Sequence, residues 1–503
     1  MASDAVGTER KSRVVGYKLK TGNFATSSPN LPQRIAVLGE ANDANQTALD
    51  LTPTTINSAQ EAGLKYGFGS PIYLAMRILK PIGGNGVGGI PVIVYPQAKA
   101  AGSVAKVLSV TPSGTSTANG THYLKVAGRD NLEGLFYAIN IVTGDTATSI
   151  ANKIRDAINS ILGSPVSATA STGVVTATSK WSGLTSDDIS ITVDLNGTSL
   201  GITYVVASVT SGSGTPTVTT ALSLFGNVWN TIVVNPYTVT ATLTELENFN
   251  GIPDPNNPTG RFAGIIMKPF VAITGSTLDD PTTITDARLS QVTIAIAPAP
   301  GSKGLALEAA ANMTVLFARV CQDNPHLDVS NQPYPDMPTP LTIGSMSVYD
   351  NRDAFVKKGS STVDLVTGKY FVQDFVTTYH PVGENPPQFS YCRNLMLDYN
   401  VRFGYFLLEQ INVVDHAIAN DNDIVSANKV IKPKQWKQIV SKYSEDLADR
   451  GLIVDTKFFQ DSILINISTT NPDRLETFFR YKRTGYVRIA STTAEAGFNF
   501  GSV

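Results

Sequence analysis

Ile35-Ala36-Val37-Leu38 is an uninterrupted apolar run, the pattern of a strand that is buried on both faces of a parallel sheet. After a polar interval, Ser70-Pro71 predicts the start of a helix, because serine suits the N-cap and proline suits the first helical position. Pro91 then opens a second apolar run, Val92-Ile93-Val94-Tyr95. Strand, helix and strand in this order predict an α/β core with a mostly parallel sheet covered by helices.

The same alternation returns in the middle of the chain. Apolar runs at 231–234, 264–267 and 292–296 predict strands, and helical patterns lie at 243–249 and 305–320. We therefore expect residues 31–100 and 220–345 to form one α/β core domain.

The interval between these two parts, residues 101–219, has a different composition, dense in Thr, Ser, Val and Gly. Short β-like runs lie at 104–110, 121–127, 136–142, 174–178, 189–193 and 202–206, and one helical stripe is formed by Ile150, Ile154, Ile158 and Ile161. Because the α/β pattern stops before this interval and resumes after it, we predict an inserted, protruding β-rich domain.

Residues 346–484 predict an α+β C-terminal domain. Strand patterns return from residue 349, above all at 369–379, and a long helix is expected over 397–411. Pro433 should begin a helix with Trp436 on its apolar face, and Gly451 should end it. The alternation of Ile463, Ile465 and Ile467 predicts a strand, and Asn471-Pro472 predicts a short helix.

The two ends of the chain are polar segments that each contain one strand pattern. Residues 1–30 contain Val14, Val15, Tyr17 and Leu19, and residues 485–503 contain Tyr486-Val487-Arg488-Ile489-Ala490. A single strand is unstable without a partner, so we expect extended arms that pair with another sheet. A strand at the edge of the chain's own domain remains the alternative.

Composition excludes several classes of protein. A length of 503 residues corresponds to about three domains. The chain has 39 basic and 41 acidic residues, which excludes a strongly basic nucleic-acid binder. It has no apolar run of about 18 residues and therefore predicts no membrane-spanning helix. The first ten residues lack the apolar stretch of a secretion signal, so we expect a large, soluble protein made in the cytoplasm.

The residues that could carry chemistry form no recognisable site. Gly84, Gly86 and Gly89 have the spacing of a dinucleotide fingerprint, but they follow a helix and precede a strand, the reverse of the required order. The four histidines and two cysteines lack zinc-site spacing, and Cys321 ends an apolar helical stripe. No nucleophile and base are recognisable, so we expect no catalytic residue, cofactor or metal.

Several motifs, in their order along the chain, resemble phage tail sheath proteins, most closely the Mu-like branch of contractile-tailed phages. The C-terminal motifs are 430–436 (VIKPKQW), 446–453 (DLADRGLI) and 471–475 (NPDRL). Similar motifs earlier in the chain are 32–39 (PQRIAVLG), 66–70 (YGFGS), 143–147 (TGDTA), 173–177 (GVVTA) and 235–238 (NPYT).

This resemblance implies a fold and a function. The family's core is subtilisin-like in fold, but this chain lacks motifs for a catalytic triad. Sheath subunits stack as hexameric rings around a tail tube and contract to drive the tube through the bacterial envelope. The implied partners are further copies of the chain, the tube protein, and baseplate and tail terminator proteins, with no nucleic acid and no membrane insertion. The implied location is the virion, after assembly in the host cytoplasm.

The resemblance also assigns roles to residues. Neighbouring subunits would be linked by arm strands formed by Val14, Val15, Tyr17, Leu19, Tyr486, Val487, Arg488 and Ile489. The receiving sheet would include Ile463, Ile465 and Ile467. The tube would contact Lys432, Lys434 and Lys437, for which an ordinary solvated helix face is the alternative. Two other functions stay open, a different virion or surface-adhesion protein and, as a weaker alternative, an α/β hydrolase.

Overall fold

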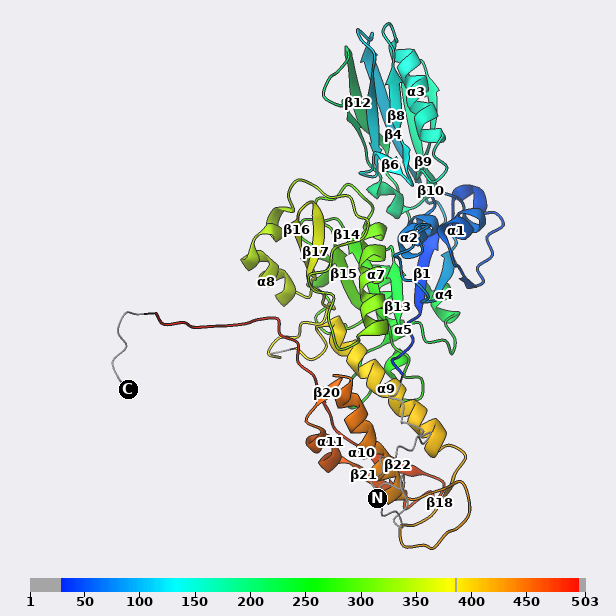
Figure 1. The fold of residues 1–503 in the computed structure, drawn as a ribbon. Coiled ribbons are helices and arrows are strands. Elements are labelled where there is room, and N and C mark those ends of the chain that lie inside the picture. The colour runs from blue at the N-terminus through cyan, green and yellow to red at the C-terminus, as the bar shows by residue number, and fades with distance from the viewer. Residues whose placement is uncertain (1–28, 385–386, 497–503) are drawn as a thin grey trace, which may run out of the picture.

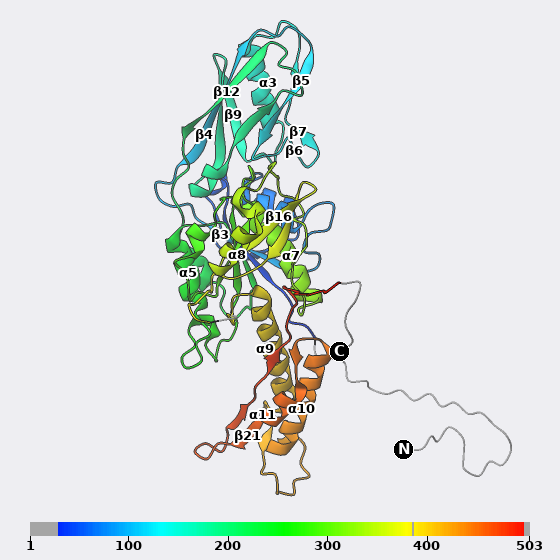
Figure 2. The ribbon, with the colours of Figure 1, turned by 90° about the vertical axis from the view of Figure 1, so that its left-hand side faces the viewer.

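A computed structural model describes residues 29–384 and 387–496 of the chain. The molecule is elongated, with a β-rich part at one end, an α/β body in the middle and a smaller α+β part at the other end (Figures 1 and 2). None of the helices in these described ranges is both long and apolar enough to cross a membrane.

The central body contains a six-stranded sheet in the order β15-β14-β13-β1-β3-β2. Five strands are parallel, and the short β2 pairs antiparallel with β3 at one edge. Their bounds are β1 Ile35–Glu40, β2 Thr54–Thr55, β3 Val92–Gln97, β13 Ile232–Asn235, β14 Val271–Ser276 and β15 Ile294–Pro298. The mixed α/β fold and its mostly parallel sheet agree with the prediction. The strand predicted at 264–267 is wrong, since these residues form a turn before β14.

Helices cover both faces of this sheet because its buried strands are apolar throughout. Alternate residues of β1 divide between two clusters, with Ile35 and Val37 in one and Ala36 and Leu38 in the other. The first cluster includes α2 Pro71–Leu79 and α7 Ala306–Asp323, and the second includes α4 Thr219–Ser223 and α5 Thr240–Asn250. As predicted, Ser70 caps α2, its hydroxyl accepting from the amide of Tyr73 at 3.1 Å. The body also contains α1 Ala59–Tyr66 and α6 Thr282–Thr285.

Residues 105–210, between β3 and β13, form two larger antiparallel sheets, the small β6–β7 sheet and helix α3, with a second hydrophobic cluster. One sheet has the order β12-β4-β10-β9 and the other β11-β5-β8. The bounds are β4 Ala105–Gly114, β5 Gly120–Val126, β6 Asn131–Leu132, β7 Leu135–Phe136, β8 Ala138–Ile141, α3 Ala147–Asn159, β9 Val166–Ser171, β10 Val174–Ser182, β11 Ile191–Asp194 and β12 Ile202–Thr210. We refer to these elements as the insert. Val104 and Ser213 exchange two backbone hydrogen bonds, of 2.9 and 3.1 Å, and so bring its ends together.

The segment after α7 packs on the central body. It comprises α8 Tyr349–Lys357 and the hairpin of β16 Thr362–Val366 and β17 Lys369–Asp374. Phe355, Val363 and Val372 lie in the same hydrophobic cluster as α2 and α7, although the sequence grouped them with the C-terminal domain. The strand pattern expected from residue 349 is wrong at its start, where α8 forms instead.

The C-terminal domain is built on α9 Cys392–Asn412 and α10 Pro433–Asp449. As predicted, α10 begins at Pro433 and buries Trp436, and Gly451 adopts the positive φ of 68° that ends many helices. The remaining elements are α11 Thr456–Ser462, β18 Ala417–Ile418, β19 Val430–Ile431, β20 Ile453–Val454, β21 Leu464–Ile467, β22 Leu475–Phe478 and β23 Lys482–Arg483. The short helix predicted after Asn471 is wrong, because residues 475–478 form strand β22.

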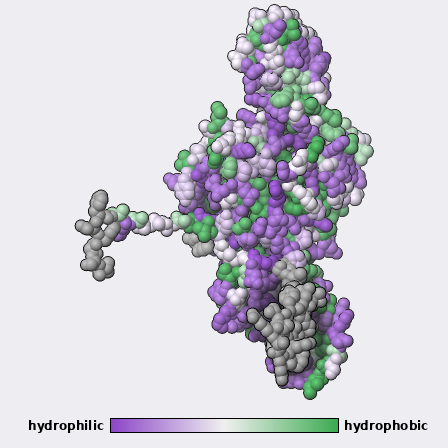
Figure 3. Space-filling view, viewed as in Figure 1, coloured by the Kyte–Doolittle hydropathy of each residue, from purple (hydrophilic) through white to green (hydrophobic). Residues whose placement is uncertain are grey.

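The described chain also has short 3-10 turns, η1 Asp43–Asn45, η2 Leu184–Asp188, η3 Gly260–Phe262 and η4 Gly344–Ser347. Polar residues cover much of the face in Figure 3, whereas apolar residues are visible at the far end of the C-terminal domain. Exposed apolar side chains near that end include Ile411, Val414 and Ile424.

Candidate assembly site

The hairpin of β21 and β22 is a two-stranded sheet with an unpaired edge on each side within the described residues. Its inner face lies on α10, where the indole Nε1 of Trp436 donates to the hydroxyl of Thr477 at 3.0 Å. On the outer face, Leu464 pairs with Phe478 across the strands, and these side chains are 59% and 49% exposed. A short sheet with open edges can accept a further strand.

The three isoleucines predicted for a receiving sheet lie at this hairpin. Ile465 and Ile467 belong to β21 and are half-buried, whereas Ile463 is buried and ends α11 just before the strand. The carbonyl of Ile463 accepts from Lys437 Nζ at 3.0 Å, which joins the start of β21 to α10. The isoleucines therefore pack the inner face of the hairpin against the domain, and the backbone groups at its two edges have no strand partner in the described residues.

Of the predicted arm residues, Val14, Val15, Tyr17 and Leu19 lie outside the described residues. The C-terminal group, Tyr486 to Ile489, is described and has neither helix nor strand assigned to it in the single chain. Val487 and Ile489 are 82% and 83% exposed. The segment leaves the central body and leads away from it (Figure 1).

Arg488 contacts the chain's own central body. Its guanidinium pairs with Asp328, lies 3.9 Å from a carboxylate oxygen of Asp374 and stacks 3.6 Å from the ring centroid of Tyr391. The Asp328 side chain is only 1% exposed. Burial raises the pKa of Asp374, while a hydrogen bond from Thr362 and the charge of Arg488 act in the opposite direction.

The three lysines predicted to contact a tube lie at the start of α10, but two of them are engaged within the chain. Lys432 Nζ donates to the carbonyl of Asp423, and Lys437 Nζ donates to Ile463 as described above. The backbone amide of Lys434 donates to Asp421 at 2.8 Å, and its exposed ammonium has no partner within residues 29–384 and 387–496. Lys434 is thus the most available cation of the three.

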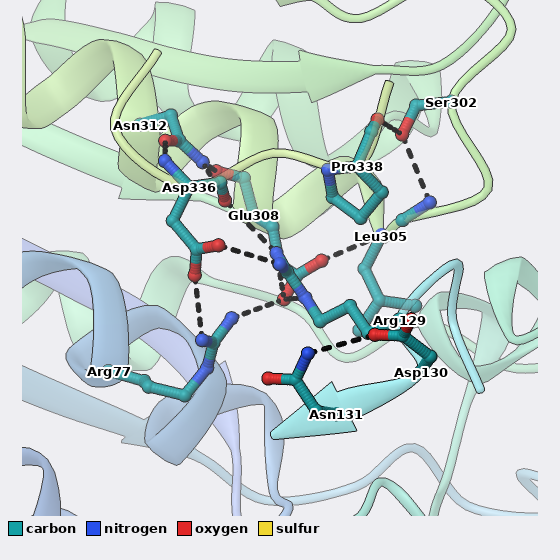
Figure 4. A network of polar contacts seen from close by, with 11 residues as sticks. Arg77, Arg129, Asp130, Asn131, Ser302, Leu305, Glu308, Asn312, Asp336 and Pro338 are labelled. Atoms are coloured by element: carbon teal, nitrogen blue, oxygen red, sulfur yellow. Dashed lines mark hydrogen bonds and ion pairs between the residues drawn. The ribbon is translucent and has the colours of Figure 1, made fainter. Parts of the chain in front are cut away.

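A buried ionic cluster joins the insert to the central body (Figure 4). Arg129 from the insert and Arg77 from α2 both contact Glu308 of α7, at 3.1 and 3.0 Å. Both arginines also contact Asp336, each at 2.7 Å; the Glu308 side chain is 2% exposed and that of Asp336 is 41% exposed. Burial acts to raise the pKa of Asp336, but the two guanidinium groups hold it below its usual value.

Sequence reasoning missed this cluster and the contacts of Arg488. Their members come from positions far apart in the chain and share no motif. The one local signal is Glu308 at the third position of α7, where its carboxylate accepts from the amide of Leu305 at 3.2 Å.

The described residues include no group of three or more His, Cys, Asp or Glu side chains that could hold a metal ion. Cys321 and Cys392 are both buried, and burial raises the pKa of each thiol. His122 is buried between the hydroxyl of Tyr204, at 2.7 Å, and the carbonyl of Thr198, at 2.9 Å, and so has a structural role.

No family profile matches the chain. Two solved structures are similar in part. One is the sheath tail protein of Desulfitobacterium hafniense, with a TM-score of 0.45 and 12% identity; the match covers 93% of this chain and all of that protein's chain. The helical sheath of the anti-feeding prophage in its contracted state has a TM-score of 0.43 and 9% identity, and covers 97% of this chain and all of that one.

In sequence, the chain is 23% identical to the Mu-like prophage FluMu tail sheath protein of Haemophilus influenzae over 406 residues, which are 79% of this chain and 80% of the relative. The resemblance indicated by the ordered motifs is thereby confirmed, and the chain is similar to a Mu-like phage tail sheath protein over most of its length.

Proposed function

We propose that the chain is a structural subunit of a contractile tail sheath, which polymerises helically around a tail tube. The proposal is supported by the similarity to a tail sheath protein over 406 residues. The observation in the fold that carries it is the β21–β22 hairpin, whose unpaired edges suit strands from other copies. The relative is a structural protein, in agreement with the expectation that this chain is not an enzyme.

In this assembly, neighbouring subunits are linked by strands donated from the terminal arms. The donors are the segment with Val14, Val15, Tyr17 and Leu19 and the C-terminal arm, of which the base is considered further below, and the acceptor is the β21–β22 hairpin. Each backbone hydrogen bond contributes about 0.5–1.5 kcal/mol, so a donated strand of about four residues contributes several kcal/mol. Such a link is specific, while its polar connecting segment lets the bodies change their packing.

The larger assembly consists of stacked hexameric rings whose contraction drives the tube through the bacterial envelope. The C-terminal domain faces the tube, and Lys434 is the lysine most free to meet an acidic tube surface. Baseplate and tail terminator proteins bind the two ends of the polymer. The subunit is a virion component that assembles in the host cytoplasm.

Negative-stain electron microscopy of the purified chain tests the function. We expect long hollow cylinders, and a chain that stays monomeric under all assembly conditions would contradict the proposal. Deleting residues 1–20 should leave folded subunits or single rings that no longer elongate, because the donated strand is lost. Deleting only residues 1–8, which precede the predicted strand, is the control and should leave the cylinders intact.

A further inference from the structure

The base of the C-terminal arm is held on the chain's own body by three residues. We infer that residues 484–488 form a cis anchor, and that only the chain from Ile489 onward reaches a second copy. The anchor follows from contacts within the single chain. The second half of the inference rests on the proposed sheath function.

Residues of the anchor alternate between contact and exposure. Thr484 accepts a hydrogen bond from Arg393 through its carbonyl at 2.9 Å, Tyr486 lies under the guanidinium of Arg393 at 5.6 Å, and Arg488 reaches Asp328. Val487 and Ile489 point to solvent. This period of two is that of an extended strand with one face on its own subunit and the other face open.

Arg488 is held on its own subunit because it is the ion-pair partner of the buried Asp328. Its carboxylate is almost completely buried, and Arg488 is its ion-pair partner in the described chain. A buried charge without a partner is strongly unfavourable, so Arg488 cannot leave with a neighbouring subunit unless another cation replaces it. Arg488 is also held by Tyr391, where the guanidinium lies over the ring.

Anchoring at Arg488 sets the reach of the arm. Holding residues 484–488 on the chain's own body removes five residues from the free arm, which shortens its extended reach by about 16 Å at roughly 3.3 Å per residue. The anchor therefore limits which neighbours the C-terminal arm can contact, and it places the tension from a bound neighbour on the central body.

Two truncations separate the roles of the two segments. A chain ending at Arg488 should keep the melting temperature of the full chain but lose or shorten its cylinders. A chain ending at Arg483 should melt at a lower temperature as well, because Asp328 loses its partner. Equal melting temperatures for the two truncations would overturn the anchor, and normal cylinders from the chain ending at Arg488 would overturn the assigned reach.

Trypsin measures the anchor in the intact chain, because cleavage after Arg488 requires its side chain to leave Asp328. Cleavage at this bond should be about tenfold faster in Asp328→Asn than in the unchanged chain. The exposed neighbour variant Asp323→Asn is the matched control and should cleave at the original rate. An unchanged rate in Asp328→Asn contradicts the anchor. If Asp328→Asn is found to unfold, the pair of truncations still decides.

A cross-link distinguishes an anchor within one chain from one exchanged between copies. In Tyr391→Cys/Val487→Cys, which keeps the Arg488–Asp328 pair, a short bifunctional thiol reagent applied to assembled polymer should give chains that are linked internally and migrate apart from unlinked monomer on a denaturing gel. A ladder of linked chains would show that Arg488 binds a neighbour, and would overturn the cis assignment. Failure of the unchanged chain to form cylinders would instead refute the sheath function and leave the melting and trypsin results as tests of the anchor.

Discussion

Replacing Arg129 with alanine should loosen the insert from the central body. Arg129 makes ion pairs with Glu308 at 3.1 Å and with Asp336 at 2.7 Å, and it donates to the carbonyl of Asp336 at 3.0 Å. Removing one member of a buried ion pair costs about 3–5 kcal/mol. Because Glu308 keeps Arg77 at 3.0 Å and Asp336 is partly exposed, we expect the lower end, about 3 kcal/mol.

Differential scanning calorimetry measures this effect. At about 2–4 °C per kcal/mol for a unit of 150–250 residues, the first transition should fall by roughly 6–12 °C. Lys125→Ala is the matched control, because Lys125 pairs with Asp194 at 3.0 Å on the surface of the same insert, where such pairs contribute about 0–1 kcal/mol. A cycle with Glu308→Gln should show a coupling of about 1–3 kcal/mol. Equal shifts for Arg129→Ala and Lys125→Ala, or strict additivity in the cycle, would refute the reasoning.

Three further outcomes are expected. Burial raises the pKa of Glu40 to about 7, so between about pH 4.5 and 7 the folded state holds a proton that the unfolded state releases. The free energy of unfolding therefore falls as the pH rises through this window. In urea titrations, Glu40→Gln should remove about 3 kcal/mol of this fall, whereas the exposed Glu495→Gln should leave it unchanged. Replacing residues 105–212 with two glycines should leave narrower cylinders, visible by microscopy, since Val104 and Ser213 already meet; a folded core that cannot assemble would contradict the peripheral placement of the insert. Lys434→Glu should weaken binding to the tube about fivefold at low salt in co-sedimentation, about 1 kcal/mol, and a larger loss in Lys442→Glu, on the same helix, would argue against the assigned face.

Local signals predicted the central strands and the helix starts well. The run from Ile35 and the Ser70-Pro71 start are governed by nearby residues, so they can be recognised from sequence alone. The errors occurred where an apolar run is short. Residues 264–267 are apolar, but Lys268-Pro269 follows, and the strand begins only at Val271. The sequence of residues 475–478 is compatible with either a helix or a strand, and pairing with β21 stabilises the strand.

The candidate site was predicted less completely than the fold. The strand predicted from the alternation of Ile463, Ile465 and Ile467 is present as β21, because this alternation is a local signal, whereas its role as a receiving sheet stays a prediction. The pairing of Arg488 with Asp328 joins residues 160 positions apart, and the sequence around either residue contains no motif that predicts it. The same holds for the cluster around Glu308, which draws on four separate segments. Long-range ionic contacts depend on the completed fold and not on local periodicity.

Helix α9 has a mechanical consequence. Leu395, Met396 and Tyr399 lie in the hydrophobic cluster of the central body, whereas Leu397, Val401 and Tyr405 lie in that of the C-terminal domain. With 21 residues, this rod is about 32 Å long. Because α9 contributes side chains to both clusters, the two bodies cannot turn independently without bending it. A tilt of the central body by about 10° would move the far end of α9 sideways by roughly 6 Å. The helix thus converts a small rotation of the central body into a larger displacement of the C-terminal domain.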